Sequence, residues 1–452
     1  MDKQEKKNKI FYGMGTIGRD MYYSFESNAL LYFLSNILTL PKAVFAAIGG
    51  VLTVLRILDA LNDPITGLII DNTKSKHGKY KPPMLIGAVL SVLFYLVLFS
   101  DLGLNNTAYI WVFGIAYILW DISYGVNDIA YWSMMTSLSV EQKKREEYGA
   151  FARICANIGM FTLMVAWQPV TSALGNTKKA WFLVALAVSI LMLAFQMLTI
   201  FGVKENKEQF KQEDNTTLKD VFKVLFANDQ LMWTSISMAL FMVGYCTTTG
   251  FATYYMQYVY GDINMYPILA GVCGVAQLGA LSIFPLFSKK FNRKQLYTMS
   301  TILVLIGYFL FFFADHSIIL ISVAAVIVFV GQAFIQLLML MFLADTIEYG
   351  QWKLGKRNDS ITFSMQPLIN KIGGALSTGI ISICLLLSGI KQEETAAVSI
   401  DAAGINTVKI FMFLLPLVFI VGGYFIYLKK FKLDEKRYSE IVEELKQRGD
   451  IR

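Results

Sequence analysis

The sequence has few of the residues on which metalloenzymes and disulfide-rich proteins depend. Only two histidines occur among 452 residues, His77 in a loop and His316 at a helix end. Neither suits a metal-dependent membrane hydrolase or a haem site, each of which needs a buried histidine. The four cysteines form no close pair and no CxxC motif, which argues against a disulfide framework and a metal site. Charged residues make up 16% of the chain, against about 25% in a typical soluble protein.

The sequence is instead rich in long apolar runs. Apolar residues make up 55% of the chain, aromatic residues make up 14%, and the mean hydropathy is +0.51. A helix needs about 20 apolar residues to cross the hydrocarbon core of a bilayer. We therefore predict an all-α membrane protein of the cell membrane with twelve transmembrane helices, over residues 10–38, 43–71, 82–100, 107–137, 147–174, 180–203, 229–259, 263–288, 295–314, 317–350, 360–390 and 405–430.

The basic residues indicate how these helices are oriented. No cleavable signal peptide follows the start MDKQEKKNK, because a long apolar segment comes directly after it. With both termini cytoplasmic, 31 lysines and arginines fall on the inner side and five on the outer side, as the positive-inside rule requires. The net charge of +7 then reflects topology and contact with membrane lipids, and it needs no nucleic-acid partner.

A long polar connection divides the chain into two similar parts. We predict an N-terminal six-helix half over 1–203, a cytoplasmic linker over 204–228, a C-terminal six-helix half over 229–430 and a cytoplasmic tail over 431–452. The short basic loops DNTKSKHGKYKPP and SKKFNRKQL follow the second helix of each half. Transporters built from duplicated halves show this arrangement and bind substrate near the membrane midplane.

Charged residues inside the apolar runs mark the candidate site. Each would cost about 2.5 to 3.5 kcal/mol if it faced lipid, so together they should face an interior cavity. Acids outnumber bases there, which favours a bound proton or metal cation. The acids are Asp20, Asp59, Asp63, Asp121 and Asp128, with Glu26 a possible sixth, and the bases are Arg19, Arg56, Arg153 and Lys371.

Two helical stripes indicate different ligands. Arg56, Asp59 and Asp63 follow an i, i+3, i+7 pattern and share one helix face, where the two aspartates favour a cation site and Arg56 fits a structural ion pair equally well. Tyr124, Asp128 and Trp132 share a face in the fourth segment. An aromatic face packs against the C–H side of a sugar ring, and charged groups hold the sugar hydroxyls. Ordinary aromatic packing is the alternative for an isolated tryptophan.

Several motifs together resemble the glycoside-pentoside-hexuronide:cation symporter family, whose best-known member carries melibiose. They are FYGMGTIGRD, RILDALNDPITG with DNTKSKHGKYKP, YILWDISYGVNDIAYWS, FARICANIG and ADTIEYGQWKLGKRNDSITFSMQPLINKIGGA, running from residue 11 to about 376. The resemblance implies a major-facilitator fold and uptake of a sugar or glycoside coupled to sodium or protons. No other cofactor is implied.

The resemblance also assigns roles by motif. It implies sugar binding by Arg19, Asp20, Tyr124, Asp128, Trp132 and Arg153, cation binding by Asp59 and Asp63, and a coupling role for Lys371 near the cation site. The segments DNTKSKHGKYKP and ADTIEYGQWKLGKR match gating segments. Asp121 replaces a glycine of the melibiose carriers, and Gly125 and Pro367 replace threonines near their cation site, which makes proton coupling more plausible than sodium coupling.

Other classes fit the sequence less well. A membrane enzyme would need a nucleophile, base or metal at the membrane edge, and none is evident. Buried ion pairs would block a channel. A major-facilitator carrier for a lipid, drug or other non-sugar solute is the alternative, although a midplane rich in Asp and Arg favours a hydroxylated substrate. Among sugars we expect a neutral glycoside, because Asp20 and Asp128 would repel an anionic one.

Overall fold

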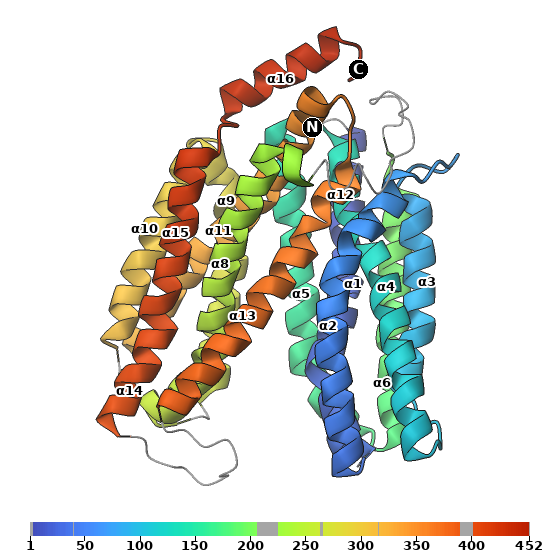
Figure 1. Ribbon diagram of the computed structural model, residues 1–452, viewed down its shortest axis with the longest axis vertical. Helices are drawn as coiled ribbons and strands as arrows, with labels where there is room; N and C mark the ends of the chain where they lie inside the picture. Colours follow the sequence, from blue (N-terminus) through green and yellow to red (C-terminus); the bar gives the residue numbers. More distant parts are fainter. Residues whose placement is uncertain are drawn as a thin grey trace. The chain divides into compact units, whose positions relative to one another are not determined.

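The structure, a computed structural model, is built from helices throughout its described part (Figure 1). It describes residues 3–38, 40–205, 225–262, 265–314, 316–388 and 401–451. The predicted all-α class is confirmed, and each predicted segment coincides with a helix to within several residues. The helices are α1 (Lys3–Tyr32, continued by π-helical Phe33–Ile37), α2 (Lys42–Asp71), α3 (Lys81–Leu98), α4 (Asn106–Leu138), α5 (Gln142–Ala173), α6 (Lys178–Gly202), α8 (Asp229–Tyr254, continued by π-helical Tyr255–Tyr260), α9 (Tyr266–Ser288), α10 (Arg293–Phe312), α11 (Ile318–Leu354), α12 (Asp359–Phe363), α13 (Met365–Leu387), α14 (Ala402–Lys409, continued by π-helical Ile410–Leu414), α15 (Leu415–Lys430) and α16 (Glu435–Gln447).

Ten of the described helical segments are long and apolar enough to cross a membrane. They comprise α3 to α6 in the first part of the chain and six segments between Asp229 and Lys430. Helices α1 and α2 are each 30 residues long and carry several of the charged residues discussed above. They are not among the ten segments that are apolar enough by this criterion.

The chain forms two compact units. The N-terminal unit comprises Met1–Val224, Gly355–Ser364 and Val442–Arg452. The C-terminal unit comprises Leu225–Leu354 and Met365–Ile441. The N-terminal unit therefore includes α12, a short helix from late in the sequence, which packs against α2 and α4.

The two units repeat one packing pattern. In the N-terminal unit α1 packs on α5 and α6, α4 packs on α2 and α3, and α3 packs on α6. In the C-terminal unit α8 packs on α13 and α15, α11 packs on α9 and α10, and α10 packs on α15. The correspondence of α1 to α8, α2 to α9, α4 to α11 and α5 to α13 follows directly from these pairs.

A pair of side-chain contacts repeats with the helices. The Asn8 amide donates to the Lys204 carbonyl at 3.1 Å and accepts from the Lys204 N–H at 2.9 Å, which joins the start of α1 to the end of α6. Gln230 makes the equivalent contacts from the start of α8, to the Lys430 carbonyl at 3.3 Å and the Lys432 N–H at 2.7 Å. Shared packing and shared end contacts support an origin by duplication.

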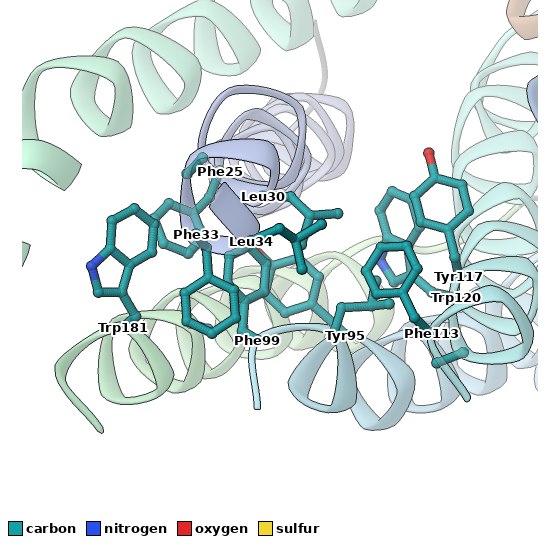
Figure 2. Close-up of a cluster of buried hydrophobic side chains, with 14 of the residues drawn as sticks. Phe25, Leu30, Phe33, Leu34, Tyr95, Phe99, Phe113, Tyr117, Trp120 and Trp181 are labelled. Atoms are coloured by element: carbon teal, nitrogen blue, oxygen red, sulfur yellow. The ribbon is translucent and has the colours of Figure 1, made fainter. Parts of the chain in front are cut away.

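An aromatic cluster forms the core of the N-terminal unit (Figure 2). Phe25, Phe33 and Trp181 are fully buried, and their ring centroids lie 5.6 to 5.9 Å apart in the pairs with Trp181. Lipid is as apolar as these side chains, so close packing rather than removal from water stabilises the contact inside a membrane. A small residue brings α1 against α5: a Cβ at Gly159 would lie 2.2 Å from the Ile17 carbonyl oxygen.

Candidate functional site

The candidate site of the N-terminal unit is built around Arg19. This residue lies on α1, and its side chain is almost completely buried. Only 2% of its side chain is exposed. Its guanidinium lies 3.3 Å from Asp20 Oδ2 and 3.1 Å from Asp128 Oδ1, so it joins α1 to α4. The two carboxylates remain 29% and 22% exposed. A buried cation thus holds two acids whose side chains are partly exposed.

Aromatic rings from α4 surround the same guanidinium. Its carbon lies 4.2 Å from the ring centroid of Tyr131 and 5.2 Å from that of Trp132. The guanidinium of Arg153, on α5, lies 4.6 Å from the Trp132 centroid. Trp132 is 4% exposed, so in this conformation it contacts two cations and offers little free face to a sugar. Cation–π contacts of this kind orient guanidinium groups and contribute about 0.5 to 2 kcal/mol each.

Tyr131 and Tyr12 belong to this cluster, although sequence reasoning did not find them. Their rings are stacked at 4.5 Å, and each hydroxyl donates to the other residue's backbone carbonyl. This reciprocal contact fixes α1 against α4 next to Arg19. No sequence signal indicates the pairing, because the two residues are 119 positions apart.

Tyr124 lies one turn from Asp128 in a group of aromatic rings. It stacks with Tyr23 at 5.3 Å, with Trp120 at 5.9 Å and with Tyr22 at 6.0 Å. It is half-buried, so its remaining surface can contact an apolar part of a ligand.

Two arginine side chains of the site have hydrogen-bond donors that a polar ligand could use. The Nε atoms of Arg19 and Arg153 are buried and have no hydrogen-bond partner among the described residues. A buried donor without a partner costs free energy, and a water or a ligand oxygen can supply one. The structure therefore brings together six of the predicted site residues, Arg19, Asp20, Tyr124, Asp128, Trp132 and Arg153.

The predicted cation residues lie on α2. Asp63 is 2% exposed, and a Cβ at Gly125 of α4 would lie 4.0 Å from its Oδ1 atom. The side chains of Asp59 and Arg56 lie outside the described residues. Pro64 follows Asp63 inside the helix and has no N–H, so the α-helical bond to the carbonyl four residues earlier is missing. Carboxylate and carbonyl oxygens are the ligands that a small hard cation prefers.

Lys371 and Asp121 complete the predicted set. Lys371 lies on α13 of the C-terminal unit and is half-buried there. Asp121 lies on α4 of the N-terminal unit and is also half-buried. Within the described residues, no group of three or more His, Cys, Asp or Glu side chains could hold a metal ion.

A second polar cluster joins α12 to the loop between α2 and α3. The Asp71 carboxylate accepts the N–H groups of Ser360 and Ile361, both at 3.1 Å, at the start of α12. Lys79 lies 2.8 Å from Asp71 and 3.7 Å from Asp359. Burial alone would lower the pKa of Lys79, but the two carboxylates more than offset it and the pKa is raised. These residues fall in or beside the two segments that the sequence assigned to gating.

Further contacts hold this loop against α6. The Glu205 carboxylate, 8% exposed, accepts the Lys79 N–H at 3.0 Å. Burial raises the pKa of Glu205 above its ordinary value. Gly78 has φ +112°, and a Cβ there would lie 2.5 Å from the Glu205 carboxylate. A glycine is therefore needed at this turn both for its backbone conformation and for space.

Comparison with known proteins gives consistent results over the whole chain. A model of the family described as MFS/sugar transport protein matches residues 11–435. A lactose permease of Lactobacillus delbrueckii subsp. bulgaricus is 34% identical over 98% of this chain and 73% of its own length. A raffinose carrier protein of Pediococcus pentosaceus is 32% identical over 97% of this chain and 71% of its own length. An isoprimeverose transporter of Lactiplantibacillus pentosus is 22% identical over 88% and 84%.

Solved structures share the fold at low sequence identity. A proton:xylose symporter superposes with a TM-score of 0.68 at 14% identity, covering 95% of this chain and 96% of that one. The fucose:proton symporter of E. coli gives 0.65 at 12% identity over 92% and 97%. These similarities establish the helical fold. They do not identify the substrate, which depends on the residues of the site.

Proposed function

Because this chain belongs to the MFS/sugar transport protein family, and so is a multi-pass membrane transporter with the major-facilitator fold rather than an enzyme, we propose that it takes up a neutral glycoside together with a cation. The resemblance noted from its motifs is thereby confirmed at the level of the family. The proposal includes twelve transmembrane helices, cytoplasmic termini, and halves over 1–203 and 229–430 joined by the 204–228 linker, with a tail over 431–452.

The observation that carries the sugar site is the bridge formed by Arg19. A fixed cation between two accessible carboxylates presents donors and acceptors within one small volume, which suits the adjacent hydroxyls of a sugar ring. Asp20 and Asp128 accept sugar hydroxyls in this proposal, and the free Nε of Arg153 donates to a sugar oxygen. Trp132 orients both arginines, and Tyr124 contacts the apolar side of the ring. An apolar lipid or drug would offer no hydroxyl groups to the two carboxylates or to the free Nε of Arg153.

The cation site belongs to α2 in this proposal. Asp59 and Asp63 supply carboxylates, and the carbonyl freed by Pro64 supplies a neutral oxygen. A proton or a sodium ion there offsets the excess of buried acid. Lys371, on α13, has the coupling role that the family resemblance implies.

The three similar carriers described above indicate one class of substrate. Their names specify lactose, raffinose and isoprimeverose, which are uncharged saccharides of two or more rings. We therefore infer that this chain transports a neutral disaccharide or a larger glycoside, and lactose is the first compound to test.

Binding to purified protein tests this proposal. Lactose should bind to the protein in detergent or nanodiscs, and its affinity should rise with sodium or with falling pH. The variant Asp128→Asn should weaken that binding about 10- to 150-fold. Wild-type protein that binds an amphiphilic drug or lipid, but neither lactose nor raffinose at any pH or sodium concentration, would instead support the alternative carrier.

A further inference from the structure

A basic patch surrounds the start of α10 and the end of α15, which pack against each other in the C-terminal unit (Figure 1). Residues 289–294, KKFNRK, contain four basic side chains and no acidic one. Residues 429–437, KKFKLDEKR, contain five basic side chains and two acidic ones. The sugar site and the cation site proposed above use none of these residues.

Most of these basic side chains have no acidic partner. Within the described part of the chain, six lysines of the patch form no ion pair, and all six are exposed: Lys289, Lys290, Lys294, Lys429, Lys432 and Lys436. The positive-inside rule accounts for basic residues at this end of the helices. It does not require that any of them line a common cavity.

Two of the six lysines line a cavity of about 110 Å³. Lys294 comes from the first turn of α10, and Lys432 comes from the segment that joins α15 to α16. Leu428 and Phe431, both half-buried, form an apolar part of the wall. A water molecule occupies about 30 Å³, so the cavity has room for a larger group. It therefore offers two ammonium groups beside an apolar surface.

The acidic side chains at this cavity are already bound within the C-terminal unit. The Glu435 carboxylate accepts the Arg293 N–H at 2.8 Å, and the Asp434 carboxylate accepts the Arg437 N–H, also at 2.8 Å. The Arg293 guanidinium is 4% exposed and pairs with the fully buried Asp345. These contacts do not use the two lysine ammonium groups of the wall, which remain for an anionic ligand.

We propose that this cavity binds the phosphate-bearing headgroup of an anionic phospholipid, with Lys294 and Lys432 as its cationic contacts. Basic pockets between membrane helices recognise such headgroups. The first turn of α10 begins at the cavity, and N–H groups at the start of a helix favour a phosphate. Leu428 and Phe431 contact the acyl chains where they leave the headgroup, which a free phosphate ion would not need. The inference goes beyond the proposed function, because it holds whichever solute the protein carries.

Binding of a fluorescent phosphatidylglycerol to the purified full chain in detergent tests the proposal. Wild type should bind this lipid more tightly than a fluorescent phosphatidylcholine, whose headgroup has no net charge. Each lysine beside an anionic headgroup strengthens binding about fivefold, so Lys294→Gln/Lys432→Gln should bind phosphatidylglycerol about 30-fold more weakly. The double variant should keep the wild-type melting temperature in lipid-free detergent, because exposed lysines without ion pairs contribute little to stability.

Lys289→Gln/Lys290→Gln is the matched control. It removes the same charge from the same basic patch, but these two side chains do not line the cavity. Its affinity for phosphatidylglycerol should fall much less than that of the cavity variant. An equal fall in the two double variants would show diffuse attraction to the whole patch and would overturn the proposed site.

Two other results would also overturn the inference. One is wild-type affinity for phosphatidylglycerol in Lys294→Gln/Lys432→Gln. The other is displacement of the bound lipid by millimolar inorganic phosphate in wild type but not in that variant, which would assign the cavity to a soluble anion. Lactose is absent from all of these measurements, so they leave the proposed sugar transport untouched.

Discussion

Replacing Asp128 with asparagine removes one of the two carboxylates that Arg19 joins, at almost constant side-chain size. Arg19 is 2% exposed, and the change leaves Asp20, at 3.3 Å, as its remaining carboxylate in this bridge. A hydrogen bond to a charged group contributes about 1.5 to 3 kcal/mol. If Asp128 holds a sugar hydroxyl, its loss should therefore weaken glycoside binding about 10- to 150-fold.

The protein should still insert and fold. Asparagine keeps an oxygen that can accept from Arg19, and the Asp20 contact remains. The two carboxylates are also 22% and 29% exposed, so solvent screens part of the pair energy. We expect a lower melting temperature with an unchanged helical circular dichroism spectrum.

Lactose affinity by isothermal titration calorimetry, with the melting temperature measured in parallel, checks this prediction. Asp101→Asn is the matched control, since Asp101 pairs with Lys178 at 2.7 Å but both side chains are more than 40% exposed. That surface pair contributes about 0 to 1 kcal/mol, and its loss should leave sugar binding unchanged. Wild-type affinity in Asp128→Asn would refute the assignment of the site.

Three further changes test separate parts of the account. Trp132→Phe should bind lactose better than Trp132→Ala, because a phenyl ring still contacts Arg19 and Arg153; equal affinity loss in both would point to the indole N–H. Asp59→Cys should keep lactose exchange across the membrane but lose accumulation, and retained accumulation would place coupling elsewhere. Glu205→Gln should flatten the dependence of melting temperature on pH: burial raises the pKa of Glu205, so its contribution to stability is present below the unfolded pKa of about 4.3 and is lost as pH rises through the native value. An unaltered profile between pH 4 and 8 would contradict this.

The sequence predicted those parts of the fold that depend on local periodicity. Long apolar runs located the long helices, and the spacing of Tyr124, Asp128 and Trp132 placed them on one face of α4. Charged residues within apolar runs indicated the N-terminal cluster, because a charge in lipid must find a partner.

Contacts between distant segments could not be predicted in this way. Asp71 accepts from the N–H groups of Ser360 and Ile361, about 290 positions later. Helix α12 therefore belongs to the N-terminal unit, although it lies late in the sequence. The contact between the Arg19 guanidinium and Tyr131 depends on the rotation of α1 relative to α4. The spacing of residues within each helix does not determine that rotation. The tail helix α16 buries the side chains of Tyr438, Ile441 and Leu445, although the tail is rich in charged residues.

Gradient-driven uptake into proteoliposomes tests the central claim most directly. Purified protein is reconstituted, and radiolabelled lactose is measured inside vesicles under an imposed proton gradient, an imposed sodium gradient, or neither. The account predicts that lactose accumulates above its external concentration under one of the two gradients, and that Asp128→Asn abolishes the accumulation. Lactose that only equilibrates, at the same rate with and without either gradient, would contradict coupled symport.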